Sequence, residues 1–201
     1  MYFEIKREAI THLKKVDPQL KEAINRIGTI KRPVNNDLYL SLLFNIIGQQ
    51  ISTSAHQTIW QRLITIVKDV TPQTIMLLDD EQLQKIGISF RKVSYIKNIT
   101  AHVIANPSFI SELEFMSDQE IIARLITLKG IGVWTAEMLL IFSLQRPDVL
   151  SYNDLAIHRG MRVLYNKDNI DKAFFEQCRL KYSPYGSTAS LYLWALAKEE
   201  N

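Results

Sequence analysis

Apolar residues recur at three- and four-residue spacing along nearly the whole chain. They line one broad face between residues 38 and 51 and a second between 59 and 67, with a break near 52–54. This spacing is typical of amphipathic helices, whereas a sheet requires long stretches of alternating apolar and polar residues. Trp60 and Trp194 lie on apolar faces of this kind, and we expect both in the core. The pattern predicts an all-α protein.

Capping residues mark where several of these helices begin. Thr71 stands before a proline, Asp79 stands before a short helix, and Ser89 opens the helix that follows. The sequence Ser-Asp-Gln-Glu at 117–120 has the spacing of a capping box, in which the first and fourth side chains each bond the other's backbone N–H. We expect that helix to lead into a turn, after which residues 134–142 form the next helix.

Two polar stretches that contain proline, 31–36 and 145–148, are the clearest breaks in the helical pattern. They separate a central helical segment, 36–144, from the terminal segments 1–35 and 145–201. The sequence contains no internal repeat and no low-complexity linker.

Composition limits the possible functions. A chain of 201 residues with 47% apolar content has enough material for a buried core. The formal charge of +3 is too small to identify a nucleic-acid binder, so a basic surface would have to be local. No apolar run approaches the length of a membrane span, and the first residues lack the apolar core of a signal peptide. We therefore expect a cytoplasmic protein without membrane contact.

Metal and cofactor chemistry finds little support in the sequence. The single cysteine, Cys178, cannot form an internal disulfide or supply the four thiolates of an iron–sulfur cluster. The four histidines do not cluster at metal-ligand spacing, and there is no P-loop, dinucleotide fingerprint or serine-hydrolase elbow. We expect no cofactor and no catalytic metal.

The segment Leu-Lys-Gly-Ile-Gly-Val-Trp-Thr-Ala at 128–136 joins two predicted helices. Its glycines let the backbone turn tightly and bring N–H groups close to an anion such as a phosphate. Glycines between apolar runs are also common as ordinary turn residues. The segment by itself leaves both interpretations open.

Three further segments, one before and two after 128–136, form an ordered series of four motifs with it. They are Ile-Ile-Gly-Gln-Gln-Ile-Ser at 46–52, Asn-Asp-Leu-Ala-Ile-His-Arg-Gly at 153–160, and Ser-Pro-Tyr-Gly-Ser-Thr-Ala at 183–189, which Tyr-Leu-Trp follows at 192–194. The series resembles the helix-hairpin-helix base-excision DNA glycosylases, specifically the 3-methyladenine DNA glycosylase II branch. Four ordered matches are more specific than a single Gly-x-Gly.

The resemblance implies a two-lobed, all-α fold with a cleft between the lobes. The central lobe would be 36–144, with the hairpin at about 118–143. The second lobe would combine 1–35 with 145–201 and carry the catalytic aspartate. The resemblance also implies a partner, double-stranded DNA with a damaged base, and we expect a monomer associated with a bacterial nucleoid.

Asp154 precedes an apolar helical pattern, so it suits the N-cap position, where helix N–H groups favour a negative charge. The resemblance implies that it is also the catalytic residue. Cleavage of an N-glycosidic bond builds positive charge on the deoxyribose, which a fixed carboxylate stabilises while it orients or deprotonates the attacking water. Asp148, near a proline loop, is a lower-ranked carboxylate, and Asn153 cannot act as a base.

The resemblance implies that Trp134, Met138, Leu155 and Tyr185 line the substrate pocket. Aromatic rings attract the positive charge of N3- or N7-alkylated purines. Trp134 stands where bifunctional relatives resembling endonuclease III place a lysine nucleophile, and without an amine there is no Schiff base and no AP lyase step. Core packing is the alternative for Trp134, and a surface turn for Tyr185. Gly186, where the family often has arginine, leaves the detail of the pocket open.

The hairpin is implied to bind DNA phosphate through Lys129, Gly130, Ile131, Gly132 and Thr135. Lys129 replaces the family's usual proline and would add a phosphate contact. By the same resemblance, the backbone carbonyls of Leu128 and Gly130 would bind a structural Na⁺ or K⁺.

Other DNA contacts are expected at two helix junctions. The family places a glutamine of the 49–50 pair toward DNA, which favours Gln50. At the second junction, Ser89 opens a helix whose N–H groups, with Arg91 and Lys92, would grip a phosphate, while an exposed Phe90 would wedge into the base stack. The alternative is that Phe90 covers the core and the two cations form a solvated face.

The sequence thus predicts a monofunctional DNA glycosylase that excises 3-methyladenine and 7-methylguanine flipped out of duplex DNA. One alternative is a glycosylase for oxidised guanine or hypoxanthine. Another is a non-enzymatic helix-hairpin-helix DNA-binding protein or a helix-turn-helix regulator. Asp154 argues against both binding modules, because neither needs a buried carboxylate.

Overall fold

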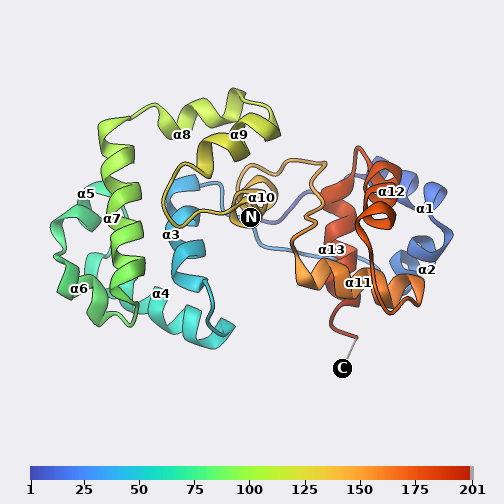
Figure 1. Ribbon diagram of the computed structural model, residues 1–201, viewed down its shortest axis with the longest axis horizontal. Coiled ribbons are helices and arrows are strands. Elements are labelled where there is room, and N and C mark those ends of the chain that lie inside the picture. The colour runs from blue at the N-terminus through green and yellow to red at the C-terminus, as the bar shows by residue number, and fades with distance from the viewer. Residues whose placement is uncertain (200–201) are drawn as a thin grey trace. The chain divides into compact units, whose positions relative to one another are not determined.

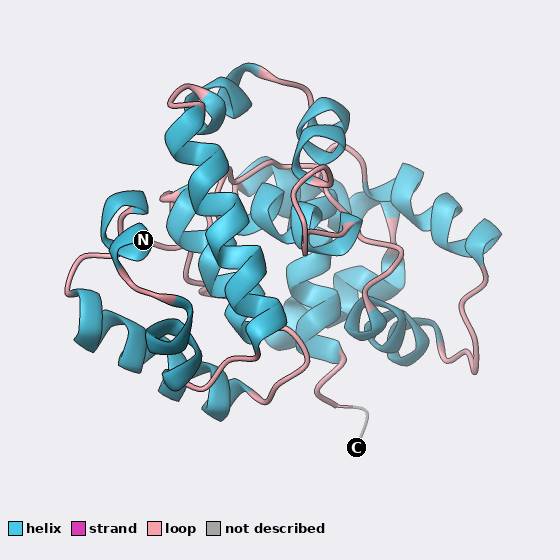
Figure 2. Cartoon of the chain, turned by 60° about the vertical axis from the view of Figure 1, so that its left-hand side comes forward, coloured by secondary structure: helices cyan, strands magenta, loops and turns pink. Residues whose placement is uncertain are grey.

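The computed structural model describes residues 1–199, which form helices joined by loops (Figure 2). This part of the chain contains no β-strand, only an isolated bridge between Tyr2 and Pro33. The prediction of an all-α fold is confirmed.

The chain divides into two compact units. Unit 1 is Met1–Val34 with Leu140–Asn201, and unit 2 is Asn35–Leu139. The first boundary lies close to the expected break at 35/36. The second lies within the helix α10 (Val133–Phe142) and not at the proline loop after 144. The apolar helical pattern runs through this boundary without a break, so the sequence gives no sign of it.

Unit 2 is built around one long helix. Its elements are α3 (Leu38–Gly48), α4 (Thr53–Val67), α5 (Pro72–Leu77), α6 (Asp80–Lys85), α7 (Phe90–Ala105), α8 (Phe109–Glu112), the 3₁₀ turn η1 (Leu113–Phe115), α9 (Asp118–Leu125) and the first part of α10. The helices α3, α5 and α6 pack against α7, and α4 packs against α3 (Figure 1).

The predicted caps of unit 2 are confirmed. The side chains of Thr71, Asp79 and Ser89 each accept a backbone N–H of the helix that follows, and residues 117–120 form a capping box. By contrast, α3 ends at Gly48, before the apolar face of its sequence pattern does.

Unit 1 consists of α1 (Arg7–Val16), α2 (Pro18–Ile27), the end of α10, α11 (Leu155–Tyr165), α12 (Lys172–Tyr182) and α13 (Gly186–Leu196). The helix α13 packs against α1, α2, α11 and α12 (Figure 1). A Cβ atom added at Gly160 of α11 would lie 2.0 Å from the carbonyl oxygen of Leu193. The backbones of α11 and α13 therefore touch at a point where only glycine fits.

A buried carboxylate joins the turn between α1 and α2 to α11 and α12. Asp17 is 1% exposed and accepts hydrogen bonds from Leu20 N at 2.9 Å, Lys181 Nζ at 3.1 Å, and the hydroxyls of Tyr165 and Tyr182. These donors compensate the loss of water around a buried charge.

Candidate catalytic and DNA-binding sites

Asp154 is the N-cap of α11, as its position in the sequence predicted. Its Oδ1 accepts the backbone N–H of Ala156 at 2.8 Å and of Ile157 at 3.0 Å. The residue is 6% exposed, so the carboxylate is shielded from solvent. Two backbone donors on one oxygen hold the negative charge at the favourable end of the helix.

A further donor reaches Asp154 from α13. The indole N–H of Trp194 donates to Asp154 Oδ2 at 3.2 Å. The Trp194 ring is half-buried, packs against the core of unit 1 and stacks on Phe142 with 5.4 Å between ring centroids. The expectation of a core residue was therefore incomplete. Apolar spacing shows which side of a helix is buried, but not which polar atom lies across from it.

Asp148 has a structural role at the start of α13. Its Oδ1 accepts the backbone N–H of Gly186 at 3.0 Å, and its Oδ2 accepts the hydroxyl of Ser183 at 2.5 Å. A Cβ atom at Gly186 would lie 2.9 Å from Asp148 Oδ1. A side chain at position 186 would therefore require the Asp148 carboxylate to shift.

Tyr185 lines a pocket of about 600 Å³ in unit 1. Its ring lies 5.3 Å from the ring of His12, between centroids. The other lining residues are Phe3, Glu4, Lys6, Glu8, Ala9, Gln145, Pro147, Pro184 and Thr188. Asp154, Leu155, Met138 and Trp134 do not line this pocket, so the contact of Tyr185 with a flipped base stays a prediction.

The remaining two residues of the predicted substrate pocket differ in exposure. Leu155, which follows Asp154 as the first residue of α11, is 80% exposed, whereas Met138 in α10 is buried. Their contact with a flipped base stays a prediction.

A pocket of about 630 Å³ in unit 2 brings together several predicted site residues. These are Gln50, Arg91, Gly130, Gly132, Trp134 and Thr135. The pocket is completed by Asn45, Gly48, Gln49, His56, Lys92 and Tyr95. Its walls come from the end of α3, the turn between α9 and α10, and the starts of α4, α7 and α10. Trp134 is 41% exposed and lines this pocket and not the one that Tyr185 lines, so its contact with a flipped base stays a prediction.

Hydrogen bonds hold three walls of this pocket together. Gln49 donates its Nε2–H to the carbonyl of Gly130 at 2.8 Å. Lys92 Nζ donates to the carbonyls of Ile47 at 2.8 Å and Gln49 at 2.7 Å. Lys92 thus caps the end of α3. This structural role was not predicted, since only a phosphate contact was expected of Lys92. Burial lowers the pKa of Lys92, and the charge of Arg91 lowers it further.

At the start of α7, the Ser89 hydroxyl accepts the backbone N–H of Lys92 at 3.4 Å. Phe90 is 59% exposed, so it does not cover the core. Arg91 is exposed and lines the pocket, while Phe90 does not. The exposure of Phe90 is a condition for the expected wedge, which stays a prediction.

The two glycines of the hairpin turn differ in what they do. Gly130 has φ +90°, and a Cβ atom there would lie 2.4 Å from the ring of Tyr95. A Cβ atom at Gly132 would meet no protein atom within 4 Å. Gly130 is thus required by the turn, and Gly132 leaves open space beside the pocket. Lys129 is exposed, whereas Ile131 is buried.

The carbonyls expected to hold a monovalent cation already accept protein hydrogen bonds. The Leu128 carbonyl accepts the N–H of Ile131 at 3.1 Å, and the Gly130 carbonyl accepts from Gln49. Each oxygen has a second lone pair, so the residues fit a Na⁺ or K⁺ ion without losing these bonds.

Comparison with known proteins identifies the family. Residues 44–183 match the HhH-GPD superfamily base excision DNA repair proteins, and this range contains the hairpin, Asp154 and all the lining residues of the pocket in unit 2. The chain belongs to this superfamily.

Individual HhH-GPD relatives are similar over nearly their full length. DNA-3-methyladenine glycosylase 1 of Schizosaccharomyces pombe is 34% identical, over 95% of this chain and 87% of the relative. A DNA-3-methyladenine glycosidase from Bacillus halodurans superposes with a TM-score of 0.86 at 32% identity, covering 98% of this chain and 92% of that one. The S. pombe 3-methyladenine DNA glycosylase in complex with abasic DNA superposes with a TM-score of 0.82 at 33% identity. The match covers 95% of this chain and 97% of that one. The recognition of the superfamily and of its 3-methyladenine branch is confirmed.

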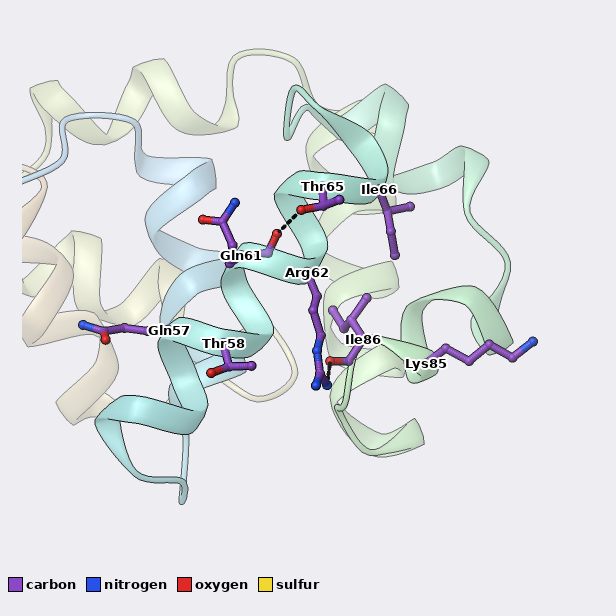
Figure 3. A pocket seen from close by; sticks show the side chains of 8 residues that line it. All are labelled: Gln57, Thr58, Gln61, Arg62, Thr65, Ile66, Lys85 and Ile86. Carbon is purple, nitrogen blue, oxygen red and sulfur yellow. Dashed lines mark hydrogen bonds between the residues drawn. The ribbon is translucent and has the colours of Figure 1, made fainter.

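Another pocket of this HhH-GPD protein, about 690 Å³ in unit 2, contains none of the predicted site residues (Figure 3). Arg62 crosses from α4 and donates to the carbonyl of Ile86 at 3.2 Å, next to the turn that follows α6. The pocket is lined by Gln57, Thr58, Gln61, Arg62, Thr65, Ile66, Lys85 and Ile86.

In residues 1–199, no helix is both long enough and apolar enough to span a membrane.

Proposed function

We propose that this protein is a monofunctional DNA glycosylase that hydrolyses the N-glycosidic bond of 3-methyladenine and 7-methylguanine in duplex DNA. The observation that carries the proposal is Asp154, a shielded carboxylate held by two backbone N–H groups and one indole N–H. The relatives are named as 3-methyladenine DNA glycosylases, and these names support the substrate class.

DNA docking rests on the pocket of unit 2. Phosphate oxygens would approach the hairpin at Gly132, where the backbone has open space, and exposed Lys129 would add a charge contact. A Na⁺ or K⁺ ion at the Leu128 and Gly130 carbonyls would supply further positive charge there. Such contacts are independent of base sequence, as a search for rare lesions requires.

The chemistry is a substitution at C1′ of the deoxyribose. The bond from C1′ to the base nitrogen breaks with its electron pair on the base, and positive charge develops on the sugar. Asp154 stabilises this charge, and water then adds its oxygen to C1′ and gives up a proton to the carboxylate. An alkylated purine cation leaves as a neutral base, so it needs little help from a general acid. The product is an abasic site.

The absence of strand cleavage is part of the proposal. A lyase step needs an amine that forms a Schiff base with C1′, and Trp134 has none. Borohydride reduction during turnover should therefore trap no covalent protein–DNA adduct. A trapped adduct would contradict a monofunctional enzyme and direct attention to Lys129.

The decisive experiment is Asp154→Asn. This change removes the charge and the base while keeping a side chain that can cap α11. Release of 3-methyladenine from methylated duplex DNA should fall by about 10²- to 10⁴-fold in single-turnover assays. Affinity for a duplex with an abasic site should persist, because phosphate contacts dominate it.

Asp168→Asn is the matched control, since Asp168 is an exposed carboxylate of the same unit. It should keep the parent's rate. Near-normal turnover of Asp154→Asn would overturn the catalytic assignment. A parent protein that releases hypoxanthine or 8-oxoguanine faster than 3-methyladenine would move it to another lesion class.

A further inference from the structure

The two oxygens of Asp154 are held by different parts of unit 1. Oδ1 is fixed by backbone N–H groups at the start of α11, whereas Oδ2 accepts the indole N–H of Trp194 from α13. Rotation about the Cβ–Cγ bond of an aspartate is soft, so contacts at Oδ1 alone leave the plane of the carboxylate poorly defined. A directional donor at Oδ2 defines that plane.

Trp194 is itself held on two sides. The preceding residue, Leu193, meets Gly160 of α11 in the close backbone contact between the two helices. The indole stacks on Phe142 at an interplanar angle of 29°, and the guanidinium of Arg32 lies 5.3 Å from the centre of the Phe142 ring. An indole N–H donates and cannot accept, so it suits an ionised carboxylate.

We propose that Trp194 is a positioning residue for hydrolysis, which orients the carboxylate of Asp154 toward the sugar and the attacking water. This inference rests on the proposed catalytic role of Asp154. Because a small misplacement of a catalytic group is costly, loss of the indole N–H lowers the rate of the chemical step. Trp194 makes no DNA contact in this proposal, so DNA affinity is unaffected.

Trp194→Phe tests the proposal, because phenylalanine keeps an aromatic ring for stacking on Phe142 and removes the N–H. The single-turnover rate of 3-methyladenine release should fall by roughly 10- to 100-fold. The dissociation constant for an abasic duplex should stay within about twofold of the parent's. Trp60→Phe makes the same chemical change in unit 2, where Trp60 packs edge-on against Phe44, and it should keep the parent's rate.

An NMR measurement tests the contact without using activity. The chain has three tryptophans, so its spectrum has three indole N–H signals. Asp154→Asn should shift the one signal that Trp194→Phe removes. A shift of another tryptophan's signal only, or of none, would overturn the contact.

The outcomes separate the two proposals. A normal rate in Trp194→Phe beside an inactive Asp154→Asn would overturn the positioning role and leave the glycosylase proposal standing. An active Asp154→Asn would overturn the glycosylase mechanism itself. If Trp194→Phe loses rate and DNA affinity together, with a lower melting temperature, then Trp194 acts through stability and the positioning role is wrong.

Discussion

Tyr185 can act on a base through its π face or through its bulk, and a substitution can separate the two. Tyr185→Leu keeps apolar volume and deletes the ring. We expect the single-turnover rates on cationic 3-methyladenine and 7-methylguanine to fall by about 2- to 30-fold more than the rate on neutral hypoxanthine. This range corresponds to a cation–π energy of about 0.5–2 kcal/mol.

Tyr185→Phe is the control for this prediction, because it keeps the ring and removes only the hydroxyl. It should preserve the preference for cationic bases. Single-turnover conditions are needed, since slow product release can hide the chemical step. Equal losses on cationic and neutral bases in Tyr185→Leu would mean that Tyr185 acts by shape.

At the residue scale, local chemistry was predictable and long-range contacts were not. Asp154 could be predicted as an N-cap because the N–H groups it accepts belong to the next three residues. The donor from Trp194 lies 40 residues away, and Gln49 reaches a carbonyl 81 residues away. Helical spacing contains no information on such pairs, so the sequence offered only the Tyr-Leu-Trp match as a signal for Trp194.

Among the elements, the hairpin turn offers a matched pair of glycines. Gly130→Ala would place a methyl group against Tyr95 in a left-handed conformation, so we expect it to lower the free energy of unfolding by about 1–3 kcal/mol. Gly132→Ala has open space, and its effect should be within about 0.5 kcal/mol. Urea unfolding of both variants tests the difference. Equal destabilisation would mean that the turn does not have the conformation described.

The open space at Gly132 also makes it a clean probe of DNA docking. Gly132→Asp puts a negative charge where a phosphate is expected, and its Cβ atom would meet no protein atom within 4 Å. Lys129→Glu reverses an exposed charge nearby. Both should weaken binding to all duplex sequences alike, and Lys129→Glu should reduce the salt dependence of the affinity. Fluorescence anisotropy over a salt series measures this. Unchanged affinity at low salt in both variants would remove the hairpin from the interface.

Element boundaries were predictable where a side chain caps the helix. The start of α7 at Ser89 and the start of α9 at Ser117 follow from capping chemistry. The end of α3 did not, because Ile51 continues the apolar spacing while Gln50 takes a left-handed conformation with φ 58°. Non-glycine residues seldom adopt that conformation, and no local signal in the sequence indicates it.

At the scale of the whole molecule, periodicity indicates buried faces but not their partners. Unit 1 combines the two terminal segments, an arrangement that only the family resemblance implied. The division within α10 has the same cause, since an uninterrupted apolar helix gives no sign of where one compact unit ends. The cleft between the lobes, the monomeric state and the localisation stay predictions.

Asp17 and the four residues that donate to it connect the N-terminal helices to α11 and α12. The charge of Asp17 therefore makes the stability of unit 1 depend on pH. Burial alone would raise the pKa of Asp17, but hydrogen bonds from Leu20, Tyr165 and Lys181 and the charge of Lys181 outweigh it, and the pKa lies below its ordinary value. Folding therefore favours the ionised form. The resulting stability is present above the ordinary aspartate pKa and is lost as the pH falls through the lower pKa of the folded state.

Asp17→Asn tests this dependence. Asparagine can still accept the Leu20 N–H as an N-cap, but it loses the charge that Lys181 and Tyr165 bind. At pH 7 the variant should be less stable by about 1–3 kcal/mol, the cost of weakening a buried network. Urea unfolding at pH 7 and at successively lower pH should show this difference begin to shrink below about pH 4, where the carboxylate of the unfolded parent takes up a proton, and disappear as the pH falls through the lower pKa of folded Asp17. Asp168→Asn, at an exposed carboxylate, should show neither effect. A stability difference that stays constant at every pH would mean that shape, and not charge, makes Asp17 important for the packing of unit 1.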